Sequence, residues 1–313
     1  MKSSDMILLL VLFGLLAAGT YVWFNIPIGE QIELKQTNSM NASASGAAID
    51  NNKEYANSTQ FYPNMRYRDK KITYSIEANC TQKKQKDIEY ALTLLSSRTF
   101  LTFTPSKENP ELRYLCSNIA PDPEEEGHFV AGEGGPSEII NTSAYAVIFT
   151  GKVSLYRPEI CEEPKIALHE TLHALGFDHS NNPESIMYPV TNCNQIVDQY
   201  IIDEINDLYK VDSAPDLSIE KVNASTKGRY LDFSIVVVNI GLKDTTSAML
   251  SVFANGDKVK DFDLEEIEIG SKKSLAVENL RLPSAEKVTL QVQSNVPSSE
   301  ITLKNNKVEL SLA

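Results

Sequence analysis

The chain has 313 residues, of which 42 are acidic and 29 are basic, so its formal net charge is -13 at neutral pH. No cluster of lysine or arginine offers the positive surface that nucleic acid requires, which excludes nucleic-acid binding. The length suffices for two domains and an anchor, and the acidic excess is typical of a solvated surface.

The N-terminus contains an uncharged, mostly apolar stretch of 19 residues from Met6 to Phe24. That is about the length of a helix that crosses a bilayer. Lys2 favours an orientation with the rest of the chain outside the cell. Ala17 and Gly19 could form a cleavage site, but the apolar run continues beyond them, so we favour an uncleaved anchor over a cleaved signal peptide. We expect residues 1–29 to tether the protein to a membrane; cleavage would make it a secreted protein.

Residues 30–65 are rich in asparagine, serine, alanine and glycine and show little apolar periodicity, which predicts a flexible linker. We expect the first folded domain over residues 66–211. Its opening elements are a strand, a helix capped by Thr81 and two further strands, and this order predicts an α+β domain with a mixed sheet. The expected ranges are Lys71 to Glu77 (strand), Thr81 to Arg98 (helix), Phe100 to Thr104 and Leu112 to Cys116 (strands).

A glycine-rich stretch follows from Gly127 to Pro136 and contains His128, which we interpret as a loop residue and not as a metal ligand. Alternating apolar residues predict strands at Ala144 to Thr150 and Lys152 to Tyr156. Pro164 fits the first turn of the next helix, with Glu162 and Glu163 near the positive end of its dipole.

That helix carries the sequence HETLHALGFDH from His169 to His179. His169 and His173 are four residues apart and therefore project from one helical face, at a spacing that suits two ligands of one metal ion. Gly176 favours a turn that could bring His179 round as a third ligand. Three protein ligands leave one position for water, as in catalytic zinc sites, and Glu170 is placed to take a proton from it. An ordinary core helix with surface histidines is the alternative, but three of the four histidines lie within these eleven residues.

This motif, followed by Met187 in a turn, resembles the metzincin zinc peptidases and, within them, the matrixins. Ser180 after the third histidine and Tyr188 and Pro189 after the methionine favour the matrixin branch. The resemblance implies that His169, His173 and His179 bind one catalytic Zn²⁺, that Glu170 is the general base and that Met187 lies beneath the metal.

The resemblance also implies a mixed five-stranded sheet with an active-site helix, and an edge strand for substrate somewhere between Gly127 and Phe149. A glycine-rich approach would let the peptide backbone come close.

This chain departs from matrixins in three ways. Only His128 remains for a second, structural zinc, so we expect none. No cysteine precedes Cys80, so latency through a cysteine is not expected. Thr191 replaces a tyrosine of the specificity pocket.

Four cysteines, an even number on an exported chain, favour two disulfides over free thiols, and their spacing leaves three pairings open. The metzincin fold implies parallel, neighbouring first and third strands with Cys80 and Cys116 at their ends, which leaves Cys161 to pair with Cys193.

Helical spacing from Gln195 to Tyr209 predicts a closing helix. Residues 212–313 then alternate with period two, and Asn255-Gly256 is a hairpin signal, which together predict an all-β immunoglobulin-like sandwich. Short motifs, among them Asn239-Ile240-Gly241 and Ile269-Gly270, resemble CARDB adhesion modules.

The sequence thus predicts a membrane-tethered extracellular zinc endopeptidase that acts on protein or peptide substrates. The alternatives are a surface adhesion protein whose metal domain is inactive, and a zinc ion that is only structural. The C-terminal domain would serve as a spacer or bind a surface ligand. A structural calcium ion stays open, because no sequence motif indicates one.

Overall fold

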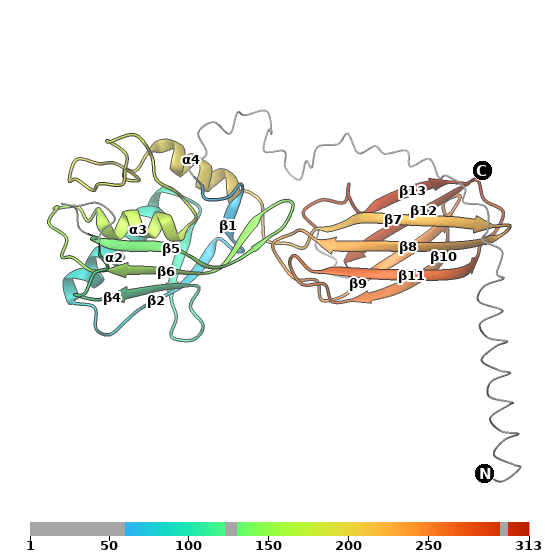
Figure 1. Cartoon of the computed structure of the whole chain (residues 1–313), viewed down its shortest axis with the longest axis horizontal. Coiled ribbons are helices and arrows are strands. Elements are labelled where there is room, and N and C mark those ends of the chain that lie inside the picture. The colour runs from blue at the N-terminus through green and yellow to red at the C-terminus, as the bar shows by residue number, and fades with distance from the viewer. Residues whose placement is uncertain (1–59, 123–129, 295–299, 313) are drawn as a thin grey trace, which may run out of the picture.

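The computed structural model describes residues 60–122, 130–294 and 300–312, which form two domains (Figure 1). The predicted anchor from Met6 to Phe24, most of the predicted linker and His128 lie outside these residues. In the part of the chain that is described, no helix is both long and apolar enough to cross a bilayer.

The first domain is built on a six-stranded sheet. Five strands follow the order β1-β6-β4-β2-β3, and the sixth strand, β5, also pairs with β6. All pairings are parallel except that between β5 and β6. The five-stranded prediction was wrong because a short first strand, too brief for a periodic signal, pairs Met65 with Ala146 at the start of β6. The two strands predicted on either side of Gly151 form one continuous strand, β6. The strands are β1 Met65–Tyr67, β2 Lys71–Ile76, β3 Thr102–Pro105, β4 Leu112–Cys116, β5 Gly132–Asn141 and β6 Ala146–Leu155.

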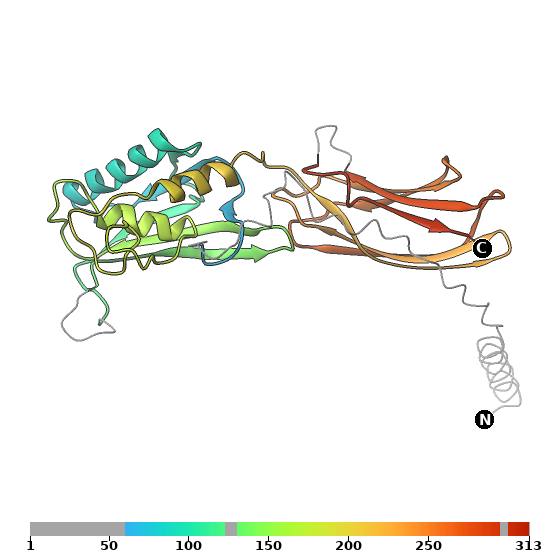
Figure 2. The ribbon, with the colours of Figure 1, turned by 90° about the horizontal axis from the view of Figure 1, so that it is seen from above.

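Three helices, α2 (Gln82–Arg98), α3 (Ile166–Ala174) and α4 (Gln199–Leu208), lie on one side of this sheet (Figure 2). The Thr81 side chain accepts a hydrogen bond from the amide of Lys84 at 3.3 Å, which is the predicted cap of α2. Helix α4 begins four residues later than predicted because the side chain of Gln195 instead closes a turn by accepting from the Asn192 amide. The core lies between the helices and the sheet.

The folded part of the first domain begins before Arg66. Gln60 forms a bridge with Phe177, and the amide of Phe61 donates to the carbonyl of Gly176 at 2.9 Å. Arg66 itself is fully buried and donates through Nη1 to the carbonyls of Leu208 and Val211. Two residues of the expected linker, Gln60 and Phe61, therefore help to fix the chain just after α3, while Arg66 helps to fix the end of α4.

The second domain has two packed sheets, of order β10-β9-β12-β13 and β11-β8-β7, around a core of aliphatic side chains and Phe233. This is the predicted all-β sandwich. Asn255 and Gly256 have φ angles of 48° and 94°, so they form the predicted turn, here between β9 and β10. The strands are β7 Leu217–Lys227, β8 Tyr230–Asn239, β9 Ala248–Ala254, β10 Asp257–Glu265, β11 Lys272–Arg281, β12 Lys287–Ser294 and β13 Lys307–Ser311.

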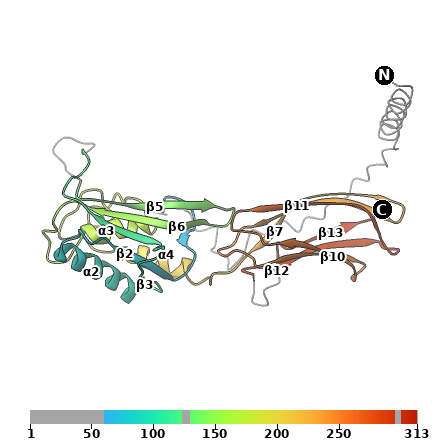
Figure 3. The same ribbon diagram turned by 90° about the horizontal axis from the view of Figure 1, so that it is seen from below.

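The two domains meet where the β5–β6 hairpin reaches the second domain (Figure 3). Tyr145 and Val147 of the first domain form a buried apolar cluster with Leu242 and Ile269 of the second. The hydroxyl of Thr142, in the hairpin turn, donates to a carbonyl of the second domain at 3.0 Å. The hairpin that carries the edge strand is thus held at its far end by the second domain.

Candidate metal centre

Helix α3 starts beneath a buried carboxylate. Glu159 accepts hydrogen bonds from the amides of Lys165 and Ile166 at 2.7 and 2.9 Å, and so satisfies donors at the helix N-terminus. The prediction that Pro164 lies in the first turn was wrong, because Lys165 is the N-cap and Pro164 precedes it. Glu159 lies six residues before the cap, too far in sequence for the usual capping pattern to predict it.

The three histidines of the motif converge. His169 and His173 lie one turn apart on α3, and Gly176, at φ 100°, turns the chain so that His179 returns to them. The Nε2 atom of His173 lies 2.9 Å from that of His169 and 3.2 Å from that of His179. Two nitrogens bound tetrahedrally to one zinc ion at 2.0 to 2.1 Å would be about 3.3 Å apart, so the three atoms fit one such ion.

Backbone carbonyls orient two of the rings. The Nδ1 atom of His169 lies 2.6 Å from the carbonyl oxygen of Ile186, and that of His173 lies 2.7 Å from the carbonyl oxygen of Phe177. A carbonyl only accepts, so each Nδ1 carries the proton and each Nε2 presents a lone pair. The close Nε2 atoms therefore repel one another unless a cation lies between them, which is the arrangement of metal-binding histidines.

Burial keeps both of these imidazoles neutral. Desolvation, with a smaller contribution from His173, lowers the pKa of His169 to about 3. Desolvation also lowers the pKa of His173 to about 4. Neutral imidazole is the form that binds a metal, so neither ring must lose a proton at neutral pH.

Glu170 lies beside the histidines, against the edge strand β5. A Cβ atom at Gly134 would lie 2.0 Å from the backbone oxygen of Glu170, and one at Gly132 would lie 2.7 Å from its Cγ. Glycine is therefore required here because α3 packs directly on β5. The expectation that this glycine-rich stretch lets a substrate backbone come close stays a prediction.

The carboxyl group of Glu170 is only slightly exposed, and burial raises its pKa to about 8, with a further contribution from Glu133. Glu133 lies on β5 and accepts a hydrogen bond from the hydroxyl of Tyr156 at 2.5 Å. A cation at the histidines would counteract both effects, because a nearby positive charge favours the ionised carboxylate.

The methionine turn supports the histidines through its backbone. Met187 is fully buried, and its amide donates to the hydroxyl of Ser185, which in turn donates to Asp198 before α4. The adjoining residue Ile186 supplies the carbonyl that orients His169. The placement of the Met187 sulfur beneath a metal stays a prediction.

Two disulfides join Cys80 to Cys116 and Cys161 to Cys193, which confirms the pairing implied by the resemblance. The first connects the turn that follows β2 to the last residue of its parallel neighbour β4. The second connects the segment before α3 to the segment after the methionine turn, and so links the two chain segments that carry the histidines and their supporting carbonyl.

One aromatic contact was not predicted. The ring of Phe61 stacks on His173, with centroids 5.8 Å apart and planes inclined by 24°. The residue lies in a segment that the composition indicated to be linker, and neighbouring Tyr62 and Pro63 gave no periodic signal. Phe61 shields one side of a candidate ligand from water.

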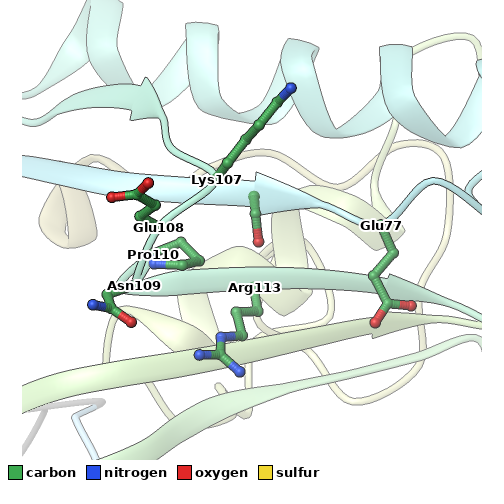
Figure 4. Close-up of a pocket in the computed structure, with 7 residues that line it drawn as sticks. Glu77, Lys107, Glu108, Asn109, Pro110 and Arg113 are labelled. Atoms are coloured by element: carbon green, nitrogen blue, oxygen red, sulfur yellow. The ribbon is translucent and has the colours of Figure 1, made fainter.

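A separate surface hollow is formed by the end of β2, the segment before β4 and β4 itself. Its charged and polar lining includes Glu77, Lys107 and Arg113 (Figure 4). None of its lining residues belongs to the histidine centre. We assign it no part in the chemistry of that centre.

Residues 123–210 match the matrixin family model, and residues 214–309 match the CARDB family model. The chain therefore resembles matrixins over the first of these ranges and CARDB domains over the second. The matrixin match includes all three histidines, Glu170 and Met187, and starts after β4. A comparison with curated proteins finds none that matches the chain.

Similar solved structures include the CARDB domain of a Pyrococcus furiosus protein in complex with di-metal ions, which is 19% identical with a TM-score of 0.26 and covers 32% of this chain and 89% of that one. A Methanosarcina acetivorans domain described as part of a putative cell surface protein is 20% identical with a TM-score of 0.27, covering 31% of this chain and 90% of that one. These values are too low to transfer a property of either protein to this chain.

Proposed function

We propose that this protein is a zinc-dependent endopeptidase, tethered to a membrane by its N-terminal segment, with both folded domains outside the cell. The convergence of three imidazole nitrogens next to a buried glutamate carries the proposal. The match to matrixins supports peptide hydrolysis as the reaction, and the two disulfides support an oxidising compartment.

His169, His173 and His179 would hold the zinc ion. When bound, zinc lowers the pKa of a water ligand and polarises a carbonyl. Glu170 adjoins one of these ligands in sequence, and its carboxylate would take a proton from an attacking water. The same carboxyl group then gives the proton to the departing amine. The burial of Glu170 suits both steps. Desolvation raises the pKa of its carboxyl group toward the pKa values of the attacking water and the departing amine, with which it exchanges the proton.

The edge strand β5 would position the substrate. Among the described strands, β5 pairs only with β6, so its second edge leaves backbone N–H and C=O groups without a neighbouring strand. An extended peptide could pair along this edge while Glu170 lies on the helix packed behind it. Pro136 within β5 is consistent with an edge strand, since proline lacks one ladder donor.

The CARDB domain would act as a binding surface that also braces the β5–β6 hairpin. Its contact through Thr142 and the apolar cluster at Tyr145 supports this role. The adhesion alternative, in which the metal domain is inactive, is weakened by an intact Glu170 and by histidine rings already oriented toward one another.

Cleavage of casein and zinc content would be measured on the full chain and on Glu170→Ala. We expect the variant to bind zinc in a 1:1 ratio and to lose activity by about 100-fold or more, since general-base catalysis typically contributes about 10² to 10⁴. Glu278→Ala, at an exposed position on β11, is the control and should retain full activity.

Zinc-loaded protein that cleaves no peptide in a broad library would reject the enzymatic proposal and favour adhesion. Normal hydrolysis by Glu170→Ala would reject the role of Glu170 while leaving the metal centre intact.

A further inference from the structure

The second domain contains four polar side chains that the metal centre does not use. Asp216 immediately precedes β7, Glu300 lies between β12 and β13, and Asn305 and Asn306 immediately precede β13. We call them the Asp216 cluster. Asp216 and Asn306 are 3% and 1% exposed.

Hydrogen bonds hold the cluster together. Nδ2 of Asn305 donates to Oδ1 of Asp216 at 2.9 Å, and Nδ2 of Asn306 donates to Oε2 of Glu300 at 2.7 Å. The amide of Leu217, next in sequence to Asp216, donates to the same Glu300 oxygen at 2.8 Å. The two carboxylates therefore belong to one site although 83 residues separate Leu217 from Glu300.

The cluster has negative charge without a balancing cation. The ion pairs found among the described residues include neither Asp216 nor Glu300. Burial raises the pKa of Asp216 to about 7, and the neighbouring charge of Glu300 contributes to this rise. Burial also raises the pKa of Glu300. Two ionised carboxylates in this place are costly unless a positive charge joins them.

The two asparagines add oxygen atoms that have no donor. Among the described residues, four buried side-chain polar atoms lack a hydrogen-bond partner, and two of them are Oδ1 of Asn305 and Oδ1 of Asn306. Each amide oxygen lies within about 2.5 Å of its own Nδ2, because both are bonded to one carbon. Since each Nδ2 contacts a carboxylate, each unpaired oxygen lies within about 5.5 Å of that carboxylate.

Buried polar atoms without partners are rare, and an unfilled ion site is one established reason for them. The donors here are all oxygen, from carboxylates and amides, with no histidine or cysteine among them. This set suits a hard cation, and its mixture of charged and neutral ligands is typical of calcium sites. Magnesium is a weaker fit, because it requires near-octahedral geometry and keeps several waters.

We infer that Asp216, Glu300, Asn305 and Asn306 form a Ca²⁺ site in the CARDB domain. On binding, each amide turns over so that its oxygen and not its nitrogen faces the carboxylates and the ion. For Asn306, ion coordination then replaces the hydrogen bonds that Nδ2 donates to Glu300 and to the carbonyl of Val292. The ion then joins the start of β7 to the segment before β13.

The site lies close to the domain boundary. The carbonyl of Pro215, adjacent to Asp216, accepts a hydrogen bond from the amide of Ile301, adjacent to Glu300, at 2.9 Å. Ile301 packs against the apolar cluster that joins the two domains. Calcium would therefore stabilise the second domain at the end that supports the β5–β6 hairpin.

Calcium binding would be measured by titration calorimetry and thermal unfolding of the full chain, with zinc at saturation and with Glu170→Ala as background to prevent self-cleavage. We expect one Ca²⁺ per chain and a rise in the Tm of the second domain that grows with the logarithm of the calcium concentration. Magnesium should produce a smaller shift at equal concentration.

Asp216→Asn removes one charge at nearly constant shape and should weaken calcium binding by about tenfold or more, which corresponds to the loss of about 1.4 kcal/mol. Asp261→Asn is the control, because Asp261 lies on an exposed strand of the same domain. It should bind calcium like the parent protein.

Asn306→Asp gives a second test in case Asp216→Asn does not fold. This variant adds an anionic ligand, so it should be less stable than the parent without calcium and should gain more stability from calcium. A parent chain that binds no calcium at millimolar concentration, or an Asp216→Asn variant with parental affinity, would overturn the inference.

Discussion

The first domain buries two of its three clustered imidazoles and the second buries Asp216 and part of Glu300, and burial affects these two clusters in opposite ways. Desolvation lowers the pKa of His169 and His173, so these rings are neutral ligands at physiological pH. Desolvation raises the pKa of Asp216 and Glu300, so ionisation there is costly.

The hydrogen-bond partners of the two clusters differ as well. In the first domain, carbonyls satisfy Nδ1 and leave Nε2 for a metal. In the second domain, amide nitrogens satisfy the carboxylates and leave amide oxygens unpaired. The first cluster is therefore already arranged for a transition metal, whereas the second requires two amides to turn before an ion fits.

Selective removal of the two proposed metals gives the largest expected effect. A chelator with strong preference for zinc should abolish peptide hydrolysis, because the proposed reaction depends on that ion, while the calcium-dependent Tm of the second domain stays unchanged. A chelator with strong preference for calcium should lower that Tm and leave zinc content unchanged. Hydrolysis and domain-resolved unfolding would be followed in the same samples. Loss of both properties with either chelator would contradict the assignment of separate sites.

Removing one disulfide should have the next largest effect, and the chain offers a matched pair. Cys161→Ser with Cys193→Ser opens a loop with a sequence separation of 32, and Cys80→Ser with Cys116→Ser opens one of 36. Each change should lower the free energy of unfolding by about 3 to 4 kcal/mol, because the unfolded chain gains similar entropy in both cases.

Only the variant without the Cys161–Cys193 bond should also reduce kcat/KM at temperatures where both variants remain folded. Only that bond joins the segment before α3 to the segment after the methionine turn. Denaturant unfolding and peptide hydrolysis would check both parts. Equal kinetic losses in the two variants would mean that the bond near the histidines has no special role in the site.

Gly134→Ala should have a smaller effect on stability, of roughly 1 to 3 kcal/mol, which is typical of overpacking. The new Cβ would lie 2.0 Å from the Glu170 backbone oxygen, so β5 or α3 must shift, and kcat/KM should fall by up to about 100-fold. Gly135→Ala is the control, because a Cβ there has no atom within 4 Å. If both variants were fully active, the close packing of α3 on β5 would not be needed for catalysis.

Local patterns predicted the parts of this structure that depend on residues near in sequence. The spacing of His169, His173 and His179 predicted their convergence, and Thr81 and Asn255-Gly256 predicted a helix cap and a turn. The sequence could not predict the additional strand Met65–Tyr67, because it has only three residues and forms a strand through its pairing with β6.

The same limit applies to the supporting residues of the site. Phe61, Glu159 and the carbonyl of Ile186 act on α3 from other parts of the chain, and nothing in their own neighbourhoods indicates those contacts. The Asp216 cluster is a stronger example, since its members come from positions 216 and 300–306 and no spacing motif connects them. Tertiary structure alone reveals which buried polar atoms lack a partner.

The smallest expected effect is a pH dependence that separates Asp216 from other titrating groups. Its pKa is about 7 in the folded protein and about 3.9 in an unfolded chain, so between these values the folded state holds a proton that the unfolded state has lost. Raising the pH through this window therefore favours unfolding, and stability changes no further above about pH 7. The amide that Asp216→Asn introduces does not titrate, so the stability of that variant relative to the parent should increase from about pH 4 to 7 in calcium-free buffer.

Denaturant titrations at several pH values, with Asp261→Asn as the control, would measure this difference. Saturating calcium should abolish it, because a bound cation favours the ionised carboxylate and returns its pKa toward or below the unfolded value. A pH dependence that persisted unchanged with calcium would show that Asp216 is a buried acid without a metal. The response to calcium therefore decides whether the second cluster parallels the first as a metal site, or is only a buried acidic group held by hydrogen bonds.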